Sequence, residues 1–187
     1  TPSAGSATDL GTFSNGADGL STAYDPDINR HIVVFRDRTS GAGQYFSNYI
    51  IFQISGTSII NNTAAAAFTN FNGGNPIVVY DTGANKVVVI YNSASYDVLA
   101  KIGTATTSSI TFGDELIVGT GNQYDFGMVY DSTASKAVVG LYTGQAVVLD
   151  PAGIPKAALQ LTRTSLLQLL IHWGPKSYLM MEVPHLE

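Results

Sequence analysis

Short apolar stretches separated by Gly, Asn, Asp, Ser and Thr fill the first 150 residues, and one pattern occurs three times. A tyrosine and an aspartate precede four turn-forming residues, one basic residue and an apolar run. The three copies start at Tyr24, Tyr80 and Tyr130. Two β-branched or aromatic stretches around turn-forming residues are typical of a β-hairpin. The pattern therefore predicts three hairpins, which we call the Tyr-Asp hairpins.

The second strand of the middle hairpin, Val87 to Ile90, is apolar at every position. Such a strand needs cover on both faces, as in stacked sheets. Each copy continues with a further strand-like stretch, a Thr/Ser/Gly turn and a segment that leads into the next tyrosine, so about four strands fall in each 50 residues. Four strands make one propeller blade.

The sequence thus predicts an all-β repeat protein of about three four-stranded antiparallel units of about 50 residues, propeller-like in architecture. The units lie near residues 24–79, 80–129 and 130–150, after an N-terminal partial unit, and residues 1–150 form the repeat domain. The alternative is a three-fold β-trefoil or prism-like domain, which closes with three units alone.

The order Tyr-Asp, turn residues, Lys, Val-Val-Val and aromatic residue, followed by a turn such as I-S-G-T-S-I at 54–59, resembles a known repeat type. It is similar to the tandem repeats of β-propeller-like segments in marine phage tail and other structural proteins. The resemblance covers roughly residues 10–150. It implies a binding or structural role on an extracellular or virion surface, and it brings no catalytic residue with it. The double glycine and the tryptophan of Kelch repeats are absent from these units.

Residues 151–187 depart from the repeat. They hold eight leucines, against six in residues 1–150, and the single tryptophan. The segment from Leu166 to Trp173 has the signals of a short helix. We expect the tail to pack, as a helix or a strand, on the repeats or on a neighbouring chain. The alternative is that this tail is translated outside the reading frame of the repeat. The sequence starts with Thr1 rather than Met, which indicates a processed or truncated chain.

Three units raise the question of closure. Propellers typically need four to eight blades, and an unclosed stack leaves edges and faces that pair with other chains. We therefore expect self-association, with a six-bladed ring from two chains as one form.

The composition narrows the classes of partner and chemistry that the protein can have. Only 12% of the residues are charged and the net charge is −5, which argues against a nucleic-acid-binding face. The absence of cysteine excludes thiolate chemistry, and no apolar run is long enough to predict membrane insertion. Low charge with many small hydroxylated residues favours an extracellular or virion surface.

The repeated aspartates, Asp25, Asp81 and Asp131, are the obvious carboxylates. Acid-base catalysis needs two carboxyls in different environments, whereas these occupy one equivalent position in three units. We expect them to accept hydrogen bonds from N–H groups of the following turn. The basic residues Arg30, Lys86 and Lys136 are expected to support them across the hairpin.

No cofactor, metal or catalytic site is predicted. The segment from Asp25 to Asn29 resembles the start of a calcium loop, but the sixth position is Arg30 rather than Gly and the twelfth is Arg36 rather than Glu. The three histidines lack zinc-site spacing, and no G-x-S-x-G sequence is present.

The copies differ most between residues 36 and 49, where the first unit is about five residues longer than the second. Loops on rigid β-scaffolds commonly carry recognition, since aromatic rings stack on sugars and polar side chains bind hydroxyls. The candidate ligand-binding residues are Arg36, Asp37, Arg38, Gln44, Tyr45, Phe46 and Tyr49. The alternative is a longer turn with Tyr45 and Phe46 packed at its base. Tyr96-Asp97 and Tyr124-Asp125 are further candidates of the same kind.

The function that we expect is a non-enzymatic structural or receptor- or glycan-binding module of a phage-type particle or an extracellular surface. The alternative is a carbohydrate-active propeller enzyme of the glycoside hydrolase type, which would need clustered, non-equivalent acids.

Overall fold

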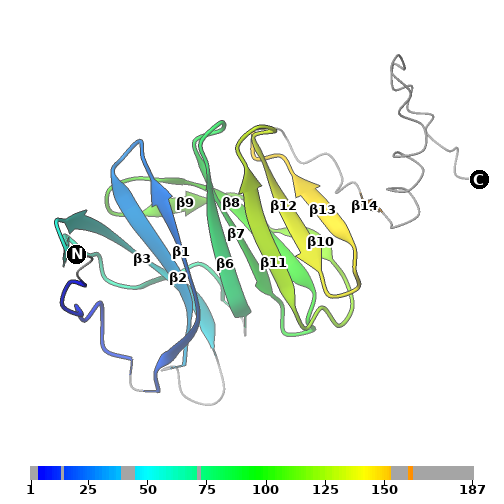
Figure 1. The fold of residues 1–187 in the computed structure, drawn as a ribbon. Coiled ribbons are helices and arrows are strands. Elements are labelled where there is room, and N and C mark those ends of the chain that lie inside the picture. Colours follow the sequence, from blue (N-terminus) through cyan, green and yellow to red (C-terminus); the bar gives the residue numbers. More distant parts are fainter. Residues whose placement is uncertain (1–3, 14, 39–44, 71–72, 153–159, 162–187) are drawn as a thin grey trace, which may run out of the picture.

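The computed structural model describes residues 4–13, 15–38, 45–70, 73–152 and 160–161, and all their regular structure is β-strand. The strands form three antiparallel sheets (Figure 1). Sheet 1 contains β1 (Ala17–Asp25), β2 (Arg30–Asp37), β3 (Phe46–Ser55), β4 (Ser58–Ile60) and β5 (Ala66–Ala67). Sheet 2 contains β6 (Gly74–Asp81), β7 (Lys86–Asn92), β8 (Val98–Ala105), β9 (Ile110–Phe112) and β10 (Leu116–Gly119). Sheet 3 contains β11 (Phe126–Asp131), β12 (Lys136–Leu141), β13 (Ala146–Leu149) and β14 (Gln160–Leu161).

The three predicted Tyr-Asp hairpins are confirmed as β1–β2, β6–β7 and β11–β12. In the middle hairpin, Tyr80 lies opposite Val87 and Asp81 lies opposite Lys86. The strand that ends at each phrase therefore pairs with the strand that follows it. The predicted units start at the phrase tyrosines, whereas each sheet already includes the strand that ends there. Each sheet therefore begins one strand earlier than the predicted unit.

The repeated aspartates close the turns, as expected. Asp81 Oδ1 accepts hydrogen bonds from Gly83 N at 2.8 Å and from Ala84 N at 2.9 Å. Asp25 and Asp131 accept the equivalent pair of bonds in the other two hairpins. A carboxylate that holds two turn N–H groups is the arrangement of an Asx turn. The repeated aspartates are thus structural in all three copies.

The basic residue after each turn bonds elsewhere. Lys86 Nζ donates to Thr104 Oγ1 at 2.7 Å, and Lys136 Nζ donates to Asp150 Oδ1 at 3.0 Å. Arg30 donates to the carbonyl of Asn29 at 2.9 Å. In these bonds the cations contact other strands or the turn backbone rather than the repeated aspartates that they were expected to support.

The fifth residue after each phrase tyrosine has a left-handed backbone, with φ of 51° at Asn29, 55° at Asn85 and 52° at Ser135. Asparagine tolerates this region better than most residues with a side chain, because its short amide bonds locally. Two hairpins therefore use a suitable residue and the third uses a less suitable one.

Replacing Ser135 with Asn should stabilise the protein by about 0.5–1 kcal/mol, because asparagine is less strained at positive φ. For a chain of this size that corresponds to a rise in Tm of about 1–4 °C. Thermal unfolding followed by circular dichroism measures the shift. Ser135→Ala is the control and should not raise the Tm; an equal rise for both variants would contradict the backbone explanation.

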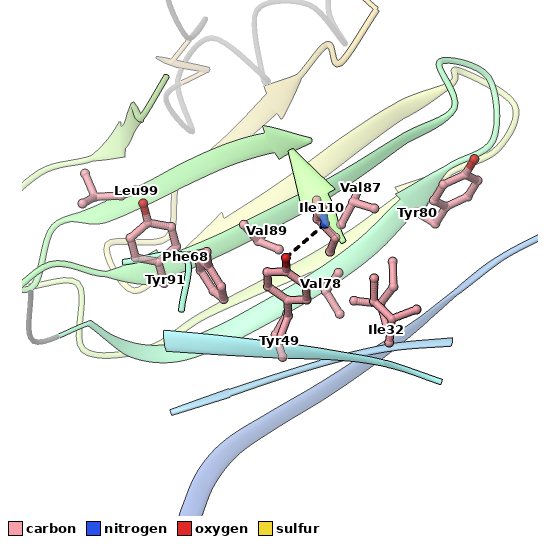
Figure 2. Close-up of a cluster of buried hydrophobic side chains, with 12 residues drawn as sticks. Ile32, Tyr49, Phe68, Val78, Tyr80, Val87, Val89, Tyr91, Leu99 and Ile110 are labelled. Carbon is pink, nitrogen blue, oxygen red and sulfur yellow. Dashed lines mark hydrogen bonds between the residues drawn. The ribbon is translucent and has the colours of Figure 1, made fainter. Parts of the chain in front are cut away.

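The three sheets stack face to face in a row with sheet 2 in the middle (Figure 1). One core lies between sheets 1 and 2, where Ile32 and Val34 of β2 face Val87, Val89 and Tyr91 of β7 (Figure 2). The alternate residues of β7, Val88 and Ile90, enter a second core with sheet 3. The apolar run of β7 is therefore buried on both faces, as its lack of alternation predicts.

The second strand of each hairpin turns equivalent residues toward the next sheet, both between sheets 1 and 2 and between sheets 2 and 3. The residues eight and ten places after the phrase tyrosine face the next sheet, as Ile32 and Val34 do in sheet 1 and Val88 and Ile90 do in sheet 2. The residues seven, nine and eleven places after it face the preceding sheet; in sheet 3 they are Ala137, Val139 and Leu141. The two faces of a sheet are therefore not equivalent: one is suited to the sheet before it and the other to the sheet after it, which gives the stack a direction.

The phrase tyrosines join neighbouring sheets. The Tyr80 hydroxyl donates to Asp27 Oδ2 in the turn of sheet 1 at 2.8 Å. The Tyr130 hydroxyl accepts from Gly83 N in the turn of sheet 2 at 3.1 Å. Burial and the bond to Asp27 raise the pKa of Tyr80 above its usual range. The first strands of sheets 2 and 3 are therefore each bonded to the turn of the sheet before them.

The free face of sheet 1 is partly covered by the segment before β1. Leu10 and Phe13 pack against Val33 and Phe35, with the Phe13 and Phe35 rings 4.9 Å apart. Residues 4–13 contain no strand, so this segment contributes packing side chains to the face of sheet 1.

Within the described residues the sheets form an open row and close neither a propeller nor a barrel. Sheets 1 and 3 share no core cluster among these residues, unlike the units of a three-fold domain, which all meet. The expected helix from Leu166 to Trp173 and most of the tail lie outside the described residues.

Candidate functional site at the loop end of the sheets

The end of the sheets opposite the Tyr-Asp turns carries the segments in which the copies differ, and we call it the loop end (Figure 1). It comprises the segments 36–38 and 45–46 of sheet 1, 92–97 and 120–125 around sheet 2, and 142–145 of sheet 3. The Tyr-Asp turns form the other end and are occupied by the structural aspartates. Residues that recognise a ligand are therefore expected at the loop end.

One structural position shows how far the copies diverge. Twelve residues after the phrase tyrosine lie Arg36, Asn92 and Tyr142, and six residues before it lie Asp18, Gly74 and Tyr124. Asp18 is opposite Arg36 in sheet 1, and Gly74 is opposite Asn92 in sheet 2. In sheet 3 the Tyr124 and Tyr142 rings are 5.8 Å apart. The same place thus holds an ion pair, a small polar pair and an aromatic pair.

In sheet 1 this place is a cationic cluster. Arg36 Nε and Nη2 donate to the two carboxylate oxygens of Asp18, each at 2.5 Å, and Arg38 lies 3.5 Å from the same carboxylate. The bond from Arg36 lowers the pKa of Asp18 below its ordinary value. The Tyr45 ring lies 5.5 Å from the Arg36 guanidinium and 5.7 Å from that of Arg38, in cation–π geometry.

The sequence candidates divide into three groups. Arg36, Arg38 and Tyr45 come together with Asp18, which sequence analysis did not single out. Asp37 lies on β2 opposite Phe46 on β3, and both are half-buried.

The remaining two candidates do not join this cluster. Tyr49 lies in the core between sheets 1 and 2, where its hydroxyl accepts from Ile110 N at 3.1 Å (Figure 2). Its ring is therefore unavailable at the surface. Gln44 lies outside the described residues.

A second group of side chains joins sheets 2 and 3. The Tyr96 and Tyr124 rings are 5.0 Å apart, and Tyr142 meets Tyr124 edge to face. Each of the three is about half exposed or more, at 49%, 54% and 63%. We call them the tyrosine cluster. Tyr142 was missed by sequence analysis, although it stands twelve residues after Tyr130, as Arg36 stands twelve after Tyr24.

Hydrogen bonds fix the loops that carry this cluster. Gln123 is buried; its backbone N–H donates to the carbonyl of Tyr96 at 2.9 Å, and its own carbonyl accepts from Asn92 Nδ2 at 2.9 Å. Gly121 N donates to Asp97 Oδ1 at 2.7 Å. The loop before sheet 3 is therefore held to the loop of sheet 2, which places Tyr96 beside Tyr124 in advance of any ligand.

Among the described residues, no group of three or more His, Asp and Glu side chains is placed to hold a metal ion. The described part of the chain also contains no helix with the length and apolar character needed to cross a membrane. No family model, no curated protein and no solved structure matches the chain.

Proposed function

We propose that this protein is a non-enzymatic structural and receptor- or glycan-binding β-repeat module of a phage-type particle or an extracellular surface, and that it self-associates by extending its row of sheets. The observation that carries the proposal is the direction of the stack. Each sheet offers one face to the next, and sheet 3 has no further described sheet on that face.

The uncovered face of sheet 3 corresponds to the face of sheet 2 that is buried. Val88 and Ile90 are fully buried between sheets, whereas the equivalent residues of sheet 3, Val138 and Gly140, are half-buried and exposed. Beside them Val129 is 61% exposed and Val148 is 41% exposed. Exposed β-branched residues on one face of a sheet are typical of an interface.

The turns provide a second indication. Among the described residues, Tyr24 is the phrase tyrosine that no sheet precedes; its side chain is about half exposed, and its hydroxyl donates to Asn29 Oδ1 of its own turn. Within the described part of the chain, the turn of sheet 3, residues 131–135, receives no phrase tyrosine from a later sheet. A second copy supplies the missing partner at both places, because its first sheet carries Tyr24 and can meet the turn of sheet 3. Three sheets from each of two copies total six, within the range of closed propellers.

The loop end is the proposed ligand-binding surface. There Arg36, Arg38 and Tyr45 combine cations and an aromatic ring in a preformed cluster. Such side chains are common at recognition surfaces.

Light scattering after size-exclusion chromatography tests the association. The wild-type chain of 19.7 kDa should give a mass of two or more chains that rises with concentration. Val129→Glu should remain monomeric, because a charge would be buried between the sheets. Ile117→Glu, at an exposed position of sheet 2, is the matched control and should behave as wild type.

A strict monomer at millimolar concentration would overturn the association. Association that Val129→Glu leaves intact would show that it uses another surface. Hydrolysis of chromogenic glycosides by the purified wild type would favour the carbohydrate-active enzyme instead.

A further inference from the structure

The tyrosine cluster is not required by the repeat itself. The position that Tyr124 and Tyr142 occupy holds Asp18 and Arg36 in sheet 1 and Gly74 and Asn92 in sheet 2, and both of those sheets form the same hairpin. An ion pair or a small polar pair therefore serves the fold equally well. Formation of the hairpin therefore does not explain why sheet 3 carries two aromatic rings at this position.

The backbone of Tyr96 gives an independent indication. Seven described residues other than glycine have positive φ; five of them are asparagine and one is Ser135. Tyr96 is the seventh, with φ of 60°. A bulky side chain is unfavourable in the left-handed region, and such outliers gather at binding sites. The protein thus holds a tyrosine at a position where its other loops use asparagine, and that tyrosine is the one that contacts Tyr124.

The surroundings of the cluster define the ligand. The segments 92–97, 120–125 and 142–145 contain no lysine or arginine, and they carry Asp97, Asn122, Asp125, Thr143 and Gln145. Asn122 Oδ1 accepts from the Tyr124 hydroxyl at 3.2 Å, and the exposed Thr143 hydroxyl bonds Gln145 Oε1 at 3.2 Å. An anionic ligand would meet carboxylates and no cation, whereas a hydroxyl-rich neutral ligand would meet acceptors.

We infer that Tyr96, Tyr124 and Tyr142 form a binding site for a neutral oligosaccharide, in which sugar rings pack their C–H faces on the exposed tyrosine rings. The aromatic face is electron-rich and attracts the weakly positive C–H groups of a sugar. The neighbouring amides, hydroxyls and carboxylates bind the sugar hydroxyls. The site differs from the Arg36–Tyr45 cluster in charge and is formed by other residues. The inference rests on the proposed role as a binding module but not on self-association.

Isothermal titration calorimetry with cellohexaose, laminarihexaose, mannohexaose and xylohexaose tests the site, with a heparin-derived hexasaccharide as the anionic comparison. At least one neutral hexasaccharide should bind with a Kd in the micromolar to low millimolar range. Tyr142→Ala and Tyr124→Ala should each weaken that binding about 10-fold or more, because each removes one stacking ring. Tyr142→Phe should bind within about 3-fold of wild type, since the ring remains.

Two further variants separate a ligand role from a structural one. Ile54→Ala removes a comparably exposed apolar side chain from β3 of sheet 1, away from the cluster, and should leave affinity unchanged. Tyr96→Asn should weaken sugar binding about 10-fold while raising the Tm by a few degrees, because asparagine relieves the backbone strain. A tyrosine kept only for packing would give the reverse, with a lower Tm.

Val129→Glu distinguishes this site from the proposed interface. It should dissociate the assembly and still bind the sugar, so failure of either proposal is visible separately. The inference is overturned if no neutral hexasaccharide binds at millimolar concentration, if only the heparin fragment binds, or if Tyr124→Ala and Tyr142→Ala retain wild-type affinity. Loss of sugar binding on self-association would also overturn it, because the cluster would then be part of the interface.

Discussion

Tyr91→Ala is expected to lower the free energy of unfolding by about 3–5 kcal/mol, the cost of emptying a large aromatic site in a close-packed core. Tyr91 has no exposed surface and packs edge to face on Phe68 across the junction of sheets 1 and 2, with the ring centres 5.5 Å apart (Figure 2). A domain stability of about 5–15 kcal/mol leaves little after such a loss. Urea denaturation measures it as a fall in the midpoint at unchanged m-value.

Tyr91→Phe is the matched variant, since it keeps the ring and removes only the hydroxyl. That hydroxyl donates to Glu115 Oε2 at 2.6 Å, and burial with this bond raises the pKa of Tyr91 above its usual range. The bond involves a carboxylate that water can solvate, so its loss should cost about 1–2 kcal/mol. If Ala and Phe destabilised the protein equally, the ring would not be filling the core as described.

Asp81→Ala is expected to destabilise the protein by about 1–3 kcal/mol, because Ala84 N loses its acceptor and Gly83 N keeps only its bond to the Tyr130 hydroxyl. Asp81 is fully buried, and its Oδ1 accepts from both Gly83 N and Ala84 N. Chemical denaturation with the wild type as reference measures the change.

Two comparisons isolate the cause. Asp131→Ala removes the same pair of bonds from an exposed turn, where water can replace them, and should cost below about 1 kcal/mol. Asp81→Asn keeps an oxygen acceptor and should recover most of the stability. Equal losses at Asp81 and Asp131 would show that burial does not govern the cost.

The local features of the repeat could be predicted from the sequence because they depend on residues a few positions apart. The turn aspartates bond N–H groups two and three residues away, and the hairpin register follows from the turn between its strands. The apolar run of β7 likewise predicts cover on both faces. These features can therefore be predicted without knowing how the sheets are arranged.

The candidate site could be predicted only in part. Arg36, Arg38 and Tyr45 were found because the first copy is longer there, but their partner Asp18 is 18 residues before Arg36 and carries no motif. Tyr49 looked like a surface aromatic, and its burial depends on Ile110 of the next sheet. Tyr142 gave no signal by itself, since one tyrosine in a hairpin loop is ordinary.

The sequence by itself determined that this protein is built from repeated β-hairpins with aspartate-closed turns and two-sided apolar strands. Only the tertiary structure decided the direction of the stack, the tyrosine bonds from each sheet to the previous turn and the meeting of Tyr96, Tyr124 and Tyr142. The physical reason is the distance along the chain over which each interaction acts. Turns and strands form from neighbouring residues, whereas a face, an interface or a cluster of rings exists only after sheets some fifty residues apart have packed together.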